Sequence, residues 1–347
     1  MSEKQMIPIP AGLLAGLVLG SILIAASVFV SRSWGPRAEV VVYTALDPAY
    51  SRLVFAEFEQ TTGIRVQAVF DTEATKTAGL VERLRRESAA PRCDVFWNNE
   101  TLRTILLARE GHFEPYRAGS ANDIPAEFRE ATGLWTGFAA RARAVAFNPA
   151  RVSSGDAPAS HAALLNTRWR GQLAIANPQF GTTGSHFAML FAGWGEARTR
   201  AWLVGLKTNE VRIVASNSAT CERAVTGEAL LGLTDTDDIE VVRRRGSSIA
   251  ESLLAADGVV VLPNTVALLK GAPNPDAARR FIDFVLNPRV EALLAASPSR
   301  QIPVRASVPV PAGGLRLADI PRFAVSYEAA ADALEPALRL ARELWGL

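Results

Sequence analysis

The chain has 347 residues, of which 49% are hydrophobic and 21% are charged, and its formal net charge at pH 7 is +2. This length predicts two domains of ordinary size, and the balanced charge gives no electrostatic reason to expect nucleic-acid binding. Because there are only two cysteines, and three histidines that are widely separated in sequence, a zinc site is not expected. Cys93 and Cys221 lie in apolar or helical patterns, which favours two buried thiols over a disulfide.

An apolar segment without a charged residue extends over residues 11–30. As a helix, these 20 residues would reach about 30 Å, the thickness of the hydrocarbon core of a bilayer. A cleaved secretory signal and an uncleaved anchor remain alternatives, because Lys4 is the only basic residue before the segment and the cleavage site at 25–27 is weak. We therefore expect residues 1–37 to be a signal peptide or membrane anchor, with membrane contact through residues 11–30. The rest of the protein is expected to be periplasmic or extracytoplasmic, membrane-anchored or secreted.

Three strands that alternate with three helices are predicted in the next part of the chain. The strands are expected at residues 39–43, 64–70 and 93–97, and each is followed by a polar loop and an amphipathic helix. Such alternation is typical of a parallel sheet covered on both faces, which binds ligands at the carboxyl ends of its strands. The three loops supply the first candidate ligand-binding residues, which are Thr44, Asp47, Glu73, Thr75, Lys76, Thr77, Asn98, Asn99 and Glu100.

The strand at residues 141–148 is predicted to cross into a second lobe. It begins with Arg141 and Arg143, which alternate and therefore face the same way. If they face a cleft, they can clamp an anion; if they face solvent, they are an ordinary charged surface, and the sequence leaves both open. The return crossing is expected at 259–269, as two strand-like pieces around a proline, and an amphipathic helix at 325–344 is expected to pack on the second lobe.

A polar loop at residues 177–185 follows the strand predicted at 173–176 and precedes a helix expected at 186–194. Its glycines and hydroxyls stand at a helix start, where exposed amides and the helix dipole favour anions, although a plain turn fits the same residues. The candidates for anion binding are Thr182, Thr183 and Gly184, with Asn217 in the next loop.

An apolar strand at residues 229–233 changes abruptly into hydroxyls and carboxylates, which indicates a strand end that opens onto a ligand cleft. Asp235 and Asp237 are two residues apart and could either share a cation or cap the next helix. Thr234, Asp235 and Thr236 are therefore candidate ligand-binding residues.

The motifs GxSxG, GxGxxG, HExxH and the Walker loop do not occur in the sequence. Their absence removes the common hydrolase, nucleotide-binding and zinc-protease classes, and no catalytic residue is assigned. Polar loops at strand ends in two lobes are instead typical of a binding protein that closes on a small ligand by a hinge motion. A membrane-anchored enzyme on the same two-lobed fold remains an alternative.

Five segments, in this order, resemble the extracytoplasmic solute-binding proteins of ABC importers, specifically the ferric-iron-binding group. The segments are residues 41–44, 55–64, 93–100, 169–178 and 264–274, and the likeness extends from residue 39 to about residue 305. The resemblance implies an α/β, two-lobed type II periplasmic-binding-protein fold with a ligand cleft between the lobes, preceded by an N-terminal hydrophobic helix. It also implies that an ABC permease and its ATPase receive the ligand, and that the protein is not an enzyme.

From this resemblance we expect the first lobe to contain residues 38–136 and 263–303, and the second lobe residues 137–262 and 304–347. The expected function is to capture a small ligand, Fe³⁺ and/or an anion, in the interlobe cleft by hinge closure. No cofactor is required; Fe³⁺ would be cargo, bound together with a synergistic anion. A binding protein for a phosphorylated or other organic anion, without iron, remains the alternative.

The ligand positions differ from those of the iron group, in which two adjacent tyrosines bind the metal. The corresponding residues here look like Thr236 and Asp237, neither of which carries a phenolate that could bind Fe³⁺. A carboxylate site of Asp235, Asp237 and Glu73 is the alternative metal site, because hard cations prefer oxygen ligands. The resemblance assigns the anion to Thr182, Thr183, Gly184, Asn217 and Arg141.

Overall fold

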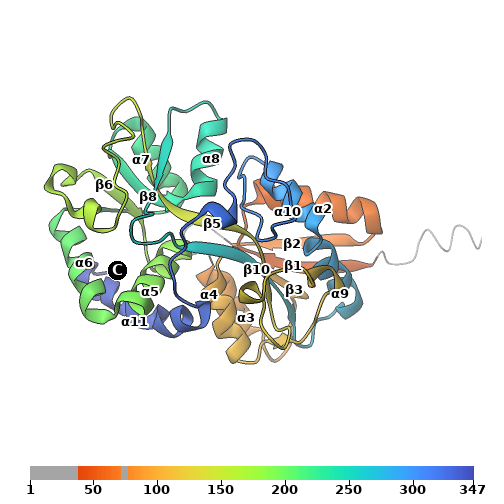
Figure 1. The fold of residues 1–347 in the computed structure, drawn as a ribbon. Helices are drawn as coiled ribbons and strands as arrows, with labels where there is room; N and C mark the ends of the chain where they lie inside the picture. Colours follow the sequence, from red (N-terminus) through yellow and green to blue (C-terminus); the bar gives the residue numbers. More distant parts are fainter. Residues whose placement is uncertain (1–37, 72–76) are drawn as a thin grey trace, which may run out of the picture.

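The computed structural model describes residues 38–71 and 77–347, which form two lobes that share one sheet (Figure 1). Several sequence predictions fall outside the described residues: the apolar segment at 11–30 and the candidates Glu73, Thr75 and Lys76. Within the described ranges, no helix combines the length and the apolar character that crossing a membrane requires.

Ten strands of the described chain form the sheet: β1 (Glu39–Thr44), β2 (Arg65–Phe70), β3 (Val95–Asn98), β4 (Phe113–Glu114), β5 (Thr136–Phe147), β6 (Leu173–Ala176), β7 (Arg212–Val214), β8 (Leu231–Asp235), β9 (Ala250–Leu253) and β10 (Val261–Leu269). Their order is β2-β1-β3-β10-β5-β8-β6-β7, with β4 paired to β10 and β9 paired to β5. In the first lobe β1 is parallel to β2 and β3, and in the second lobe β6 is parallel to β7 and β8. The alternation of strands and helices in the sequence therefore predicted the parallel pairs of the first lobe.

The strand β5 connects the two lobes. Its first half pairs with β10, its second half pairs with β8, and all of its residues are buried. The return crossing, β10, is one continuous strand and not two pieces. The proline that suggested a break, Pro263, causes a shift of register between Pro263 and Asn264, because a proline cannot donate a ladder hydrogen bond.

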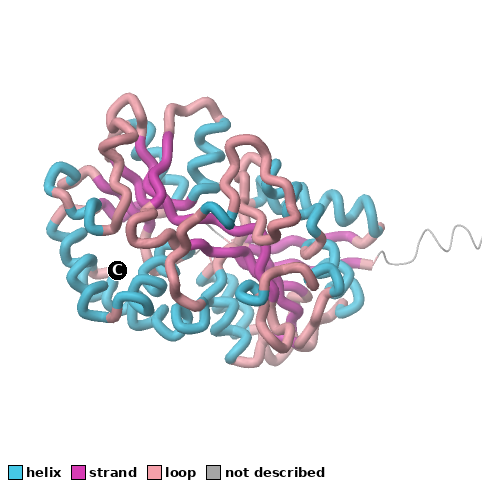
Figure 2. Tube along the Cα trace, in the orientation of Figure 1, coloured by secondary structure: helices cyan, strands magenta, loops and turns pink. Residues whose placement is uncertain are grey.

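The α-helices surround the central strands in both lobes (Figure 2). They are α2 (Pro48–Thr62), α3 (Ala78–Arg86), α4 (Thr101–Arg109), α5 (Gly181–Trp194), α6 (Glu196–Thr208), α7 (Asn217–Thr226), α8 (Thr236–Arg244), α9 (Pro275–Val285), α10 (Pro288–Ala296) and α11 (Tyr327–Trp345). The helix α2 ends before Gly63, which has a φ of 71°, a left-handed conformation that stops a helix. The C-terminal helix α11 packs on α5 and α6 and also contacts α4 of the first lobe.

The helix α5 begins at Gly181, five residues before the predicted start at His186. The residues that suggested a loop, Thr182, Thr183 and Ser185, form the first turns of this helix and are buried. Their hydroxyls bind partners in the centre of the molecule, so their polarity reflects the site described below and not exposure to solvent.

Candidate ligand-binding cleft

A small cleft lies between the two lobes, at the ends of strands from both. It encloses about 40 Å³, which is room for an ion or a few waters, since one water needs roughly 10–15 Å³ of such space. Seven of the predicted ligand-binding residues line it: Asp47, Asn99, Arg141, Thr182, Asn217, Asp235 and Asp237. The strand ends identified from the sequence therefore do meet in space.

Three aspartates converge at the end of β8. Asp235 is the last residue of the strand, and Asp237 and Asp238 lie in the first turn of α8, where the helix dipole favours negative charge. One carboxylate oxygen from each lies within 4.8 Å of the others. Asp235 and Asp237 are buried and Asp238 is half-buried. This group is the candidate cation site among the described residues, because carboxylate oxygens are the ligands that hard cations prefer.

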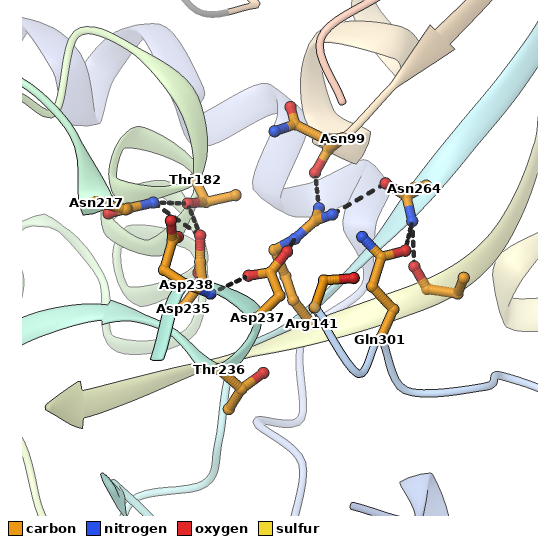
Figure 3. A network of polar contacts seen from close by, with 12 residues as sticks. Asn99, Arg141, Thr182, Asn217, Asp235, Thr236, Asp237, Asp238, Asn264 and Gln301 are labelled. Atoms are coloured by element: carbon orange, nitrogen blue, oxygen red, sulfur yellow. Dashed lines mark hydrogen bonds and ion pairs between the residues drawn. The ribbon is translucent and has the colours of Figure 1, made fainter. Parts of the chain in front are cut away.

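Arg141 connects this group to the first lobe (Figure 3). Its Nε donates to Asp237 Oδ2 at 2.8 Å, its Nη2 donates to Asn264 Oδ1 at 3.0 Å, and its Nη1 donates to the carbonyl of Asn99. Burial acts to lower the pKa of Arg141, but the negative charges of Asp237 and Asp235 outweigh it and raise that pKa above its usual value. Arg141 is therefore a buried cation that holds Asp237 in place.

Arg143 lies two residues further along β5 and binds Asp235, whereas Arg141 binds Asp237. Its Nη1 donates to Asp235 Oδ1 at 2.8 Å and to Thr182 Oγ1 at 3.1 Å, and its Nε donates to His186 Nδ1 at 3.4 Å. Its side chain is 1% exposed. Both arginines are buried, so the solvent-facing alternative is wrong, and Arg141 is one of the residues that line the cleft.

Several predicted residues use their polar groups inside the fold. The Thr44 hydroxyl accepts from the Leu46 amide, the Thr236 hydroxyl accepts from the Ala142 amide, and the Thr234 hydroxyl donates to the Asn217 carbonyl. Asn98 Nδ2 donates to Thr104 Oγ1, which fixes the turn after β3. Gly184 has no space for a side chain, because a Cβ there would lie 2.4 Å from the carbonyl oxygen of Pro178.

Glu100 lies at the start of α4 and contacts the second lobe. Its carboxylate accepts from the backbone amides of Leu102 and Arg103, as an N-cap residue does, and from Ser185 Oγ at 2.6 Å. Thr77 Oγ1 donates to Asn99 Oδ1 at 3.2 Å, which ties the start of α3 to the cleft. These residues position the cleft wall and join the lobes.

Sequence reasoning did not assign a role to Asp238, Asn264 or Tyr50, and it considered Arg143 only together with Arg141 as a possible anion clamp. An asparagine in the middle of an apolar strand was the available signal for Asn264, and Asp238 directly follows an assigned aspartate. Tyr50 is buried in α2, and its pKa is raised by burial and then by the negative charges of Asp237 and Asp47. Asp47 is close because it precedes the same helix, whereas the proximity of Tyr50 to Asp237 depends on how the lobes meet, for which the sequence holds no signal.

The family of bacterial extracellular solute-binding proteins matches residues 105–313 of the chain. This is more than half of its length. The chain belongs to this family of solute-binding proteins. Membership confirms that the protein is a solute-binding protein and not an enzyme. The solved structures described next confirm the two-lobed fold.

This solute-binding protein is similar to proteins whose names or structure titles refer to iron, and also to one that was solved with a sugar phosphate. It is 26% identical to Iron uptake protein A1 of Synechocystis sp. over 89% of its own length and 88% of that protein. The crystal structure of iron-bound HitA from Pseudomonas aeruginosa superposes with a TM-score of 0.81 at 22% identity, over 89% of this chain and 99% of HitA. The structure of AfuA from Actinobacillus pleuropneumoniae, with fructose-6-phosphate bound, superposes with a TM-score of 0.80 at 18% identity, over 90% of this chain and all of AfuA.

Proposed function

We propose that this solute-binding protein is the periplasmic component of an ABC importer and that its cargo is Fe³⁺. Its family consists of extracellular solute-binding proteins, which supports a place outside the cytoplasm. The names of its relatives, Iron uptake protein A1 and Major ferric iron-binding protein among them, support iron as the cargo. On this proposal, an ABC permease and its ATPase are the partners that receive the ion.

The observation that carries this proposal is the convergence of Asp235, Asp237 and Asp238 on one side of the interlobe cleft. Fe³⁺ is a small, hard cation that oxygen ligands bind well, and the aspartates place oxygens within 4.8 Å of one another. An organic phosphate fits this place less well, because carboxylates repel an anion and the space of about 40 Å³ is small for a sugar. The comparison with AfuA therefore supports the fold and not a sugar-phosphate cargo.

Asp237 and Asp238 are the proposed ligands from the second lobe, and Asp47 faces the same cleft from the first. A ligand set drawn from both lobes would make binding and closure one event, which is how a hinged protein signals that it is loaded. Glu73 stays a predicted ligand, since it lies outside the described residues.

Equilibrium dialysis against the Fe³⁺–citrate complex, followed by metal analysis, tests the proposal. We expect one iron per chain for the wild type and at least a tenfold weaker affinity for Asp237→Asn and Asp238→Asn, since each substitution removes a charged ligand that is worth more than about 1.4 kcal/mol. Asp276→Asn is the matched control, because the Asp276 side chain is 97% exposed and distant in sequence from the cleft. No iron bound by the wild type, or equal binding by all variants, would contradict the proposal. A parallel titration with fructose-6-phosphate is expected to show no binding.

A further inference from the structure

Three hydrogen-bond donors from three elements point at one place beside the cleft. They are the Thr182 hydroxyl in the first turn of α5, the Asn217 amide at the start of α7, and the Arg143 guanidinium on β5. Two helix N-termini and a buried guanidinium form an environment of positive potential. Such an arrangement is a binding place for an oxyanion, and we call it the anion seat.

The anion seat is already filled by a side chain of the protein. Asp235 Oδ2 accepts from Thr182 Oγ1 at 2.5 Å and from Asn217 Nδ2 at 2.8 Å (Figure 3). Asp235 Oδ1 accepts from Arg143 Nη1 at 2.8 Å. The Asp235 side chain is 3% exposed. In the pairing of β5 with β8, Arg143 is directly opposite Asp235, so the sheet itself fixes the register of this pair.

The remaining donors of Arg143 are also used within the protein. Its Nη2 donates to Thr183 Oγ1 at 3.3 Å and to the Leu233 carbonyl at 3.2 Å, and its Nε donates to His186 Nδ1. A free anion that entered the seat would have to displace the Asp235 carboxylate and would be repelled by it at short range. The seat is therefore built for one carboxylate, the one that the chain supplies.

We infer that Asp235 is a built-in anion: its carboxylate takes the place that a phosphate, carbonate or carboxylate from solution would otherwise take. The cleft then holds its cation without an anion from solution. Because the Asp235 carboxylate occupies the donors of the anion seat and repels other anions, anionic solutes do not bind there. The part of this inference that concerns the cation rests on the proposed function. The part that concerns the seat does not, and it can be tested without iron.

Removal of the built-in anion should open the seat to small anions. In Asp235→Ala the donors of Thr182, Asn217 and Arg143 remain, and the space of one carboxylate is free. We expect this variant to melt at a lower temperature than the wild type, and we expect formate, exchanged for chloride at constant ionic strength, to raise that temperature saturably. The rise should reach about 5 °C when formate exceeds its dissociation constant roughly a hundredfold, because a ligand of the native state stabilises it by mass action.

The controls separate rescue at the seat from a general salt effect. The wild type, Asp276→Ala and Asp235→Asn are expected to show no saturable response to formate or to inorganic phosphate, because in none of them is the seat vacant. If Asp235→Ala does not fold in chloride, its refolding in increasing formate gives the same information, with native yield as the measurement. A folded Asp235→Ala that does not respond to formate, or a wild type that formate or phosphate stabilises saturably, would overturn the inference.

The outcome for iron distinguishes this inference from the proposed function. Wild type that binds no Fe³⁺, together with formate rescue of Asp235→Ala, would reject iron as cargo and leave the built-in anion intact. Wild type that takes up Fe³⁺ from its citrate complex only when phosphate or carbonate is added would support iron and reject the built-in anion. We expect Fe³⁺ binding by the wild type to be unchanged within twofold by added phosphate, and binding by Asp235→Ala to increase with formate.

Discussion

The Nε2 atoms of His161 and His186 lie 2.8 Å apart in the interior of the second lobe. The surrounding hydrogen bonds define which nitrogen of each ring carries the proton. Because the Nε of Arg143 can only donate, His186 Nδ1 accepts from it, and His186 Nε2 therefore donates to His161 Nε2. His161 then carries its proton on Nδ1, which donates to Asp257 Oδ2 at 3.0 Å. Two neutral imidazoles thus link Arg143, at the cleft, to Asp257.

This pair predicts a loss of stability in mild acid. Burial lowers the pKa of His186, with further lowering by His161 and Arg143, and burial also lowers the pKa of His161, where Asp257 opposes it and Arg198 adds to it. The native protein therefore keeps both rings neutral at pH values where the unfolded chain is protonated. The contribution of the pair is complete above about pH 6.5, the usual histidine pKa, and is lost as the pH falls below it. Urea unfolding between pH 5 and 8 measures this decrease.

Two variants test whether the histidine pair causes the decrease. His186→Asn removes one of the two buried rings and should give a flatter dependence of the unfolding free energy on pH. His112→Asn is the control, since His112 lies in the first lobe beside Glu110, and it should keep the slope of the wild type. An identical slope in all three proteins would contradict this assignment.

A second prediction concerns the buried pair of Glu291 and Arg305, whose side chains are both fully buried. Arg305 Nη1 donates to Glu291 Oε2 at 2.9 Å, and Glu291 Oε1 accepts from the amides of Ala139 and Val304. Glu291→Ala would leave two buried amides without this partner and would leave Asp123 as the remaining carboxylate that binds Arg305, so we expect it to lower the free energy of unfolding by about 3 kcal/mol. Arg289→Ala, which removes a side chain that is 73% exposed, should change it by less than about 1 kcal/mol. Urea titration monitored by tryptophan fluorescence measures both.

The sequence predicted the strands that precede the polar loops in both lobes, because their apolar residues change to polar ones where the strands end, but it did not predict the short strands β4 and β9. It also gave a candidate residue on three of the four elements that meet at Asp235, namely Asp235 itself on β8, Thr182 on α5 and Asn217 on α7. The fourth element is β5, which carries Arg143. It could not reveal that Asp235 faces Arg143, which is 92 residues away, because that depends on the register between β8 and β5. The contact between His161 and His186 was hidden for the same reason. Wide separation in the sequence suggested isolated histidines, and the packing of α5 brings them together.

A third prediction concerns the contact between the lobes at Glu100 and Ser185. The Ser185 hydroxyl donates to the Glu100 carboxylate at 2.6 Å, and both residues are buried. A hydrogen bond to a charged group contributes roughly 1.5–3 kcal/mol, so Ser185→Ala should favour the open arrangement and weaken cargo binding by about tenfold or more. An increase in the radius of gyration of the unloaded protein by small-angle scattering would report the opening. Ser153→Ala, at an exposed hydroxyl that binds Asp156, should change neither quantity. Equal affinity and equal dimensions in Ser185→Ala and the wild type would show that this contact does not hold the lobes together.

The two cysteines give the fourth prediction. Cys93 and Cys221 are free and buried in different lobes, and burial raises the pKa of each thiol well above its usual value. At pH 8 both are therefore protonated and shielded, whereas the thiolate is the form that reacts with disulfide reagents. We expect the native protein to react with dithionitrobenzoate only as fast as it unfolds, and to release two equivalents of the product in urea. Rapid reaction of the native protein would show that one thiol is accessible. An absence of reaction in urea would show that Cys93 and Cys221 are joined in a disulfide, contrary to this prediction.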